Sequence, residues 1–74
     1  MAVPFIERIR LVQSFLKRNG LYDGKIDGIA GPLTNAGIDW LGIESRWPVK
    51  RKIIAAIQHF ANQYGVDVGT VDGR

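Results

Sequence analysis

The sequence has no cysteine, only one histidine, and no apolar run that approaches the roughly 20 residues of a membrane-spanning helix. Without cysteine there are no disulfides and no thiolate metal sites, and His59 with the few carboxylates present does not make a zinc site. The N-terminus also lacks the basic and then apolar layout of a signal peptide. We therefore expect no membrane segment, no metal and no other cofactor.

The composition is that of an ordinary globular protein, with 46% hydrophobic and 23% charged residues in 74. A domain of this length buries only about 60% of the surface of its unfolded chain, so the core must supply most of the stability. The net charge of +3 favours anionic partners such as nucleic acid, acidic lipid or a cell wall that carries free carboxylates. A net charge of +3 is too small to indicate which of these partners the protein binds.

Apolar spacings of four, three and four residues predict two long helices, over residues 4–19 and 49–64. A shorter helix is predicted over residues 31–41. The first helix has Pro4 at its start and Gly20 after its end, which is the usual order of these two residues. Its polar residues, including Gln13, are expected on the solvent face. The predicted fold class is all-α, a small three-helix bundle.

The segment from residue 20 to residue 34 joins the first two helices, and four of its fifteen residues are glycine. Asp27-Gly28 is predicted to form a tight turn, with the carboxylate bonded to backbone N–H groups and a positive φ at the glycine. Ile26 and Ile29 are expected to insert into the bundle and fix the loop. A calcium loop is rejected, because Lys25 stands at a ligand position and Thr34 replaces the final glutamate.

The chain contains an internal repeat with an offset of 45 residues, which places Asp27-Gly28 on Asp72-Gly73. The repeats run from about 4 to 41 and from about 49 to 74, and each is a helix, a glycine, a short apolar segment and an Asp-Gly turn. Such units pack on each other because neither buries its apolar face alone. The other paired positions are Ile9 and Ile54, Val12 and Ile57, Gln13 and Gln58, Phe15 and Phe60, Gly20 and Gly65, Gly24 and Gly69, and Ile26 and Val71.

The first repeat resembles the peptidoglycan-binding domain of bacterial and phage cell-wall hydrolases. The resemblance covers about half of the chain, and its motifs are Val12-Gln13, Leu16, Gly20-Leu21-Tyr22, Gly24, Ile26-Asp27-Gly28, Gly31-Pro32 and Thr34. Two features depart from the family. Residues 42–48 look like an insertion, and the second repeat stops at Arg74, before any Gly-Pro-Thr segment.

The resemblance implies a noncatalytic binding module that anchors a peptidoglycan hydrolase, such as a phage endolysin, to its substrate. A shallow groove beside the first loop would offer an aromatic face from Tyr22 or Trp40, and Lys25 or Arg18 would bind carboxylates of the stem peptide. Trp40 also has the alternative interpretation of a core residue. The candidate ligand-binding residues are Tyr22, Lys25, Asp27, Gly28, Thr34 and Trp40.

The partners implied are peptidoglycan, through its glycan or its stem peptide, and a catalytic domain that follows in a longer parent chain. The expectation of a longer chain comes from Val66, Val68 and Val71, an apolar segment with no helix after it to cover it. With no signal peptide, the protein would be made in the cytoplasm and reach the cell wall through a phage holin or host lysis.

Two other function classes are considered. A small basic helix-turn-helix DNA-binding protein is the alternative, but the glycine loop and the 42–48 connector fit its short turn poorly, so nucleic acid is an unlikely partner. The polar residues that favour it are Lys50, Arg51, Lys52, Gln58, His59, Asn62 and Gln63. A muramidase needs two opposed carboxylates, and nothing places Glu7 and Glu44 in that way. We therefore expect no enzymatic activity from this chain alone.

Overall fold

Three helices make up the regular structure of the computed structural model, which describes residues 4–65 and 71–73. They are α1 (Phe5–Arg18), α2 (Pro32–Asp39) and α3 (Val49–Gln63), and the described residues include no strand. The predicted all-α three-helix bundle is confirmed. The predicted ends agree to within one or two residues, since α1 and α3 begin directly after Pro4 and Pro48 and α2 stops at Asp39.

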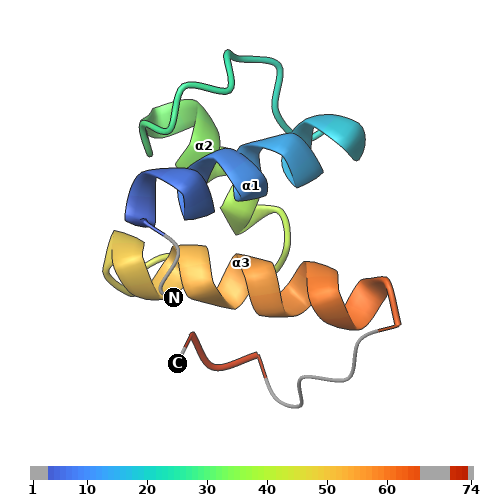
Figure 1. Ribbon diagram of the computed structural model, residues 1–74. Coiled ribbons are helices and arrows are strands. Elements are labelled where there is room, and N and C mark those ends of the chain that lie inside the picture. Colours follow the sequence, from blue (N-terminus) through green and yellow to red (C-terminus); the bar gives the residue numbers. More distant parts are fainter. Residues whose placement is uncertain (1–3, 66–70, 74) are drawn as a thin grey trace.

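The long helices α1 and α3 form the main packing contact of the bundle. Both run in the same direction in Figure 1, and the connection through α2 returns the chain to the end where α1 begins. Phe15 of α1 stacks on Phe60 of α3 with ring centroids 4.9 Å apart and planes inclined by 22°. These two residues occupy the same position in the two repeats. The repeated helices therefore meet through equivalent faces.

The core lies between the three helices and includes two residues of the connecting loops. Helix α3 contributes Ile53 and Phe60, as the apolar spacing predicts, and Ala55 and Ala56 are also fully buried. Tyr64, at the end of the predicted apolar stripe, is half exposed. Small alanine side chains let α3 approach its neighbours closely. The buried apolar residues are Ile9, Val12, Leu16, Tyr22, Ile38, Ile43, Ile53, Ala55, Ala56 and Phe60.

The short helix α2 contacts the bundle through one narrow face. Ile38 and Thr34 are buried, and a Cβ at Gly37 would lie 2.8 Å from the carbonyl oxygen of Leu21. The small residue at 37 is therefore required for α2 to pack against the first loop. Leu33 is 58% exposed because it lies outside this face.

The C-terminal segment packs back on α3. Val71 is partly buried against the core, and Arg51 Nε donates a hydrogen bond of 2.9 Å to the carbonyl oxygen of Asp72. Val66 and Val68, the other members of the apolar segment expected to lack a covering helix, lie outside the described residues. In the part of the chain that the structure describes, no helix is long and apolar enough to cross a membrane.

Candidate binding groove

The side chain that organises the first loop is Gln13, which is fully buried. The apolar pattern of the sequence predicts this residue on the solvent face of α1, and that prediction is wrong. Its Oε1 accepts a 3.0 Å hydrogen bond from the backbone N–H of Gly28. Its Nε2 lies within hydrogen-bond distance of four oxygens: Asp27 Oδ1 at 3.1 Å, Ile29 O at 3.0 Å, Thr34 Oγ1 at 3.1 Å and Tyr22 Oη at 3.4 Å.

A buried amide suits this position because it has both a donor group and an acceptor. The loop presents a backbone N–H and several oxygens to α1. A hydrophobic side chain would leave the buried N–H of Gly28 without a partner, at a cost of about 1–3 kcal/mol, and would remove the hydrogen bonds from the amide to the oxygens. Gln13 thereby joins α1 to the loop and to the start of α2. Ile26 and Ile29 do not insert into the bundle as predicted, since both are exposed, Ile29 by 67%.

The Asp27-Gly28 turn has the local structure that the sequence predicts. The Asp27 carboxylate accepts a 2.9 Å hydrogen bond from the N–H of Ile29, and Gly28 has a φ of +75°. That hydrogen bond, followed by the one from the Gln13 side chain, lowers the pKa of Asp27 below its ordinary value. The carboxylate therefore stays ionised, and the turn stays bonded, to a more acidic pH than a free aspartate would allow.

The same contact occurs in the second repeat. Gln58 Oε1 accepts hydrogen bonds from the N–H groups of Asp72 and Gly73 at 3.1 and 2.9 Å, and its Nε2 donates to Asp72 Oδ1 at 3.3 Å. Gly73 has a φ of +74°, as Gly28 does. Each repeat thus fixes its Asp-Gly turn to its own long helix through a glutamine amide.

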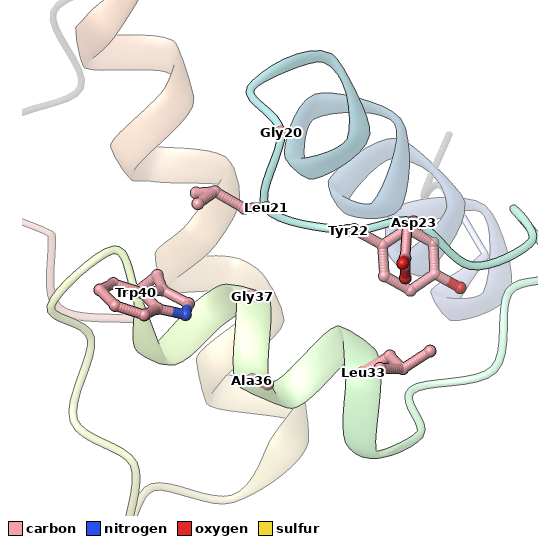
Figure 2. A pocket seen from close by; sticks show the side chains of 8 residues that line it. All are labelled: Gly20, Leu21, Tyr22, Asp23, Leu33, Ala36, Gly37 and Trp40. Carbon is pink, nitrogen blue, oxygen red and sulfur yellow. The ribbon is translucent and has the colours of Figure 1, made fainter.

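With the loop fixed, residues 20–23 lie across from α2 and form one wall of a shallow groove. Its volume is about 260 Å³, and we call it the α2 groove. Figure 2 shows Trp40 and Leu33 at opposite ends of the α2 wall, with Tyr22 and Asp23 on the loop across from Leu33 and with Leu21 nearer to Trp40. The lining residues are Gly20, Leu21, Tyr22, Asp23, Leu33, Ala36, Gly37 and Trp40.

Two further hollows continue the α2 groove along the helix. One, of about 400 Å³, shares Ala36 and Trp40 with it and extends past Asp39 to Gly42. The other, of about 150 Å³, shares Tyr22 and Leu33 with it and reaches Asp27 and Thr34. The three hollows are therefore neighbours on the surface around α2.

Trp40 is the exposed aromatic residue of this surface. Its side chain is 78% exposed, so it is not a core tryptophan. The other tryptophan, Trp47, is partly buried and has the Arg51 guanidinium 3.8 Å from its ring centroid. Of the two, Trp40 is the one that presents its ring to solvent.

The other candidate ligand residues have different environments. Tyr22 is only 9% exposed and Thr34 is buried; the Tyr22 hydroxyl donates to the carbonyl oxygen of Lys25. These two side chains support the groove from beneath and offer little surface to a ligand. Asp27 and Gly28 form the fixed turn. The Lys25 and Arg18 side chains are exposed but line none of the three hollows, so the structure does not place them where the sequence analysis expected them.

The α2 groove and the hollow that contains Asp39 are lined by an exposed indole, aliphatic side chains and the carboxylates of Asp23 and Asp39. Among the described residues, no group of three or more His, Asp or Glu side chains is placed to hold a metal ion. Comparisons with models of protein families, with curated proteins and with solved structures found no match to this chain.

Proposed function

We propose that this chain is a noncatalytic module that binds peptidoglycan in the α2 groove and anchors a cell-wall hydrolase, such as a phage endolysin, to its substrate. The observation that carries the proposal is Trp40, 78% exposed beside a concave surface. Burying so large an apolar side chain is favourable, and a tryptophan left at the edge of a groove is typical of a binding surface. The flat apolar faces of sugar rings match an exposed indole.

The α2 groove has the size expected of a low-affinity site that binds a short segment of a polymer. The hollows along α2 are shallow, so they bury only one side of a ligand and give modest affinity. Modest affinity is enough on an insoluble wall, where a tethered catalytic domain gains from a high effective concentration of substrate. The resemblance of the first repeat to peptidoglycan-binding domains supports the same polymer.

The structure offers less support for the DNA-binding alternative. Two of the basic residues on α3 that favour it are occupied within the protein: Arg51 lies over Trp47 and bonds to Asp72, and Lys52 is buried. Residues 40–48 separate α2 from α3, which is longer than the turn of a helix-turn-helix unit. We therefore keep DNA binding as an outcome of the test.

The test is sedimentation of the purified chain with insoluble peptidoglycan over a range of protein concentrations. We expect Trp40→Ala to weaken binding about tenfold, since one stacked aromatic contributes on the order of 1 kcal/mol or more. Tyr64→Ala is the matched control, because Tyr64 is also an exposed aromatic residue but lies at the end of α3, away from the groove.

Circular dichroism of each variant shows whether it is folded. If folded Trp40→Ala binds as well as the wild type, the ligand does not occupy the α2 groove. The wild-type chain could instead fail to sediment with peptidoglycan and reduce the gel mobility of DNA, with an affinity that falls steeply as salt increases. That result would show that the function is DNA binding.

A further inference from the structure

The N-terminus of α3 presents backbone donors that have no acceptor. Its N-cap residue is Pro48, and no side chain caps the helix. The N–H of Lys52 bonds to the carbonyl oxygen of Pro48, so the N–H groups of residues 49–51 lie ahead of the first hydrogen bond of the helix. In the described part of the chain, none of these three groups donates a hydrogen bond. Pro48, Val49 and Lys50 are exposed, and the end of the helix is therefore open to solvent.

The side chains at this end of α3 have a charge that the helix does not favour. A helix N-terminus carries a partial positive charge, which is stabilised by acidic residues in the first turn. The first turn of α3 has no acidic residue, and the helix begins Val-Lys-Arg-Lys. Glu44, the acidic residue of the 40–48 connector, is bonded to the backbone N–H and the guanidinium of Arg46. The N-terminus of α3 is therefore electropositive, and the nearest acid along the chain is already paired.

Lys52 is the residue that indicates a ligand at this position. It is only 6% exposed, and in the part of the chain that the structure describes its ammonium group forms no hydrogen bond or ion pair. Among the described residues, Asn35 Oδ1 is the fully enclosed side-chain atom without a partner, so the Lys52 ammonium still reaches solvent at its tip. A charge that is mostly buried and unpaired is unfavourable. An anion from outside the chain would supply the missing partner.

Helix geometry directs the Lys52 ammonium towards the N-terminus of α3. The Cα–Cβ bonds of an α-helix tilt towards its N-terminus, and a long side chain covers the turn that precedes its own Cα. For Lys52 this turn is residues 48–51, which carries the unbonded N–H groups. The Arg51 guanidinium is not available for the same task, because it lies over Trp47 and bonds to Asp72. The ammonium of Lys52 and the three N–H groups thus converge on one end of the helix.

We propose that the N-terminus of α3 binds an oxyanion, a carboxylate or a phosphate group, through the N–H groups of residues 49–51 and the ammonium of Lys52. Helix N-termini bind such groups because the N–H donors and the helix dipole act together, and a lysine adds a full charge. Because so little of Lys52 is exposed, the site fits one projecting anionic group and not the surface of a nucleic acid. Its residues line none of the three hollows around α2, so the inference is independent of the peptidoglycan groove.

The first test is an NMR titration of the ¹⁵N-labelled wild-type chain with sodium phosphate, at constant pH and at an ionic strength held constant with sodium chloride. We expect the amide signals of residues 49–51 to shift and to saturate. The N-terminus of α1 is the internal control, since it also follows a proline and lacks a side-chain cap but has Glu7 in its first turn. The signals of residues 5–7 should not saturate. No saturable shift at α3, or equal shifts at both helix ends, overturns the inference.

The second test removes the ammonium group. Lys52→Met keeps a long apolar stem in the buried position, and we expect it to weaken phosphate binding about tenfold in the same titration. Lys25→Met is the control, because Lys25 is an exposed residue of the first loop and the change in net charge is the same. It should alter the affinity by less than about twofold, since distant surface charges are screened. Equal losses in the two variants would mean that net charge controls binding, which overturns the inference.

Circular dichroism shows whether Lys52→Met is folded. If it is not, Lys52→Gln takes its place, and the titration of the wild-type chain remains decisive in either case. Trp40→Ala should bind phosphate as the wild type does, because Trp40 lines the α2 groove and not the end of α3. Failure of the peptidoglycan proposal and failure of the oxyanion site are therefore distinguishable.

A third comparison identifies which oxyanion the site prefers. Sodium acetate and sodium phosphate are titrated separately at the same pH and ionic strength. Tighter binding of acetate assigns the site to a carboxylate, such as that of a peptide, and tighter binding of phosphate assigns it to a phosphate group. If neither anion shifts the signals of residues 49–51 more than sodium chloride does, the helix end responds only to ionic strength and the inference is wrong.

Discussion

At the residue scale, one buried amide determines the shape of the first loop. The backbone of residues 27–29 turns towards α1 and presents an N–H and a carbonyl oxygen to it, and Gln13 meets both. The exposed isoleucines on either side of this turn contribute little to holding it. The loop is therefore fixed by directional hydrogen bonds, which specify its position more narrowly than apolar contacts would.

We expect Gln13→Met to lower the free energy of unfolding by about 2–3 kcal/mol, because it keeps the side-chain volume but leaves the buried Gly28 N–H without a partner and removes the hydrogen bonds from the amide to the loop oxygens. Gln63→Met is the control, as Gln63 is an exposed residue at the end of α3, and it should change stability by less than about 0.5 kcal/mol. Urea unfolding measures both variants. Equal stability of Gln13→Met and the wild type would show that the amide is not what holds the loop.

At the element scale, the helices could be predicted from the sequence, and the contact between α1 and the first loop through Gln13 could not. The spacing of Ile9, Val12 and Leu16, with Pro4 before them and Gly20 after, depends only on neighbours within one helix. Burial of Gln13 depends on groups between 9 and 21 positions away along the chain, and a periodic pattern within one helix does not say where those groups lie. The identical Gln and Asp-Gly spacing in the second repeat was the available signal.

The structure of the first loop also predicts that substitution by alanine costs more stability at Gly28 than at Gly20, although the two glycines have nearly equal φ. A Cβ at Gly28 would lie 2.6 Å from Ile6 Cγ2, whereas a Cβ at Gly20 would have nothing within 4 Å. Gly20→Ala should therefore cost only the left-handed backbone strain, about 1–2 kcal/mol, and Gly28→Ala about 2–4 kcal/mol. Urea unfolding measures both costs.

Ile6→Ala separates the two contributions to the cost at Gly28. It removes the obstructing methyl group, so adding it to Gly28→Ala should recover the steric part of the loss and bring the cost of the glycine substitution towards that of Gly20→Ala. If Gly20→Ala and Gly28→Ala cost the same, α1 does not approach the turn as closely as the structure shows.

At the scale of the whole molecule, two similar units join side by side. Each has a long helix and an Asp-Gly turn bonded to a glutamine of that helix. The helices α1 and α3 run in the same direction, and the first loop and residues 71–73 lie on opposite outer sides of the helix pair (Figure 1). No disulfide ties the units together, and a domain of this size has about 4–11 kcal/mol of stability. The contact between the helices therefore decides whether the units stay associated.

Phe15 and Phe60 are the equivalent residues that meet at this contact, with ring centroids 4.9 Å apart. Stacked aromatic pairs contribute about 0.5–1.5 kcal/mol beyond the area that they bury. In a double-mutant cycle, Phe15→Leu and Phe60→Leu should thus show a coupling of that size, because either substitution alone already removes the stacking. Phe15→Leu with Val49→Ala is the control cycle, since Val49 begins α3 while Phe15 lies near the end of α1, and its effects should add to within about 0.5 kcal/mol. Additive effects in both cycles would mean that the two repeats are held together by general apolar burial, with no specific contribution from the paired rings.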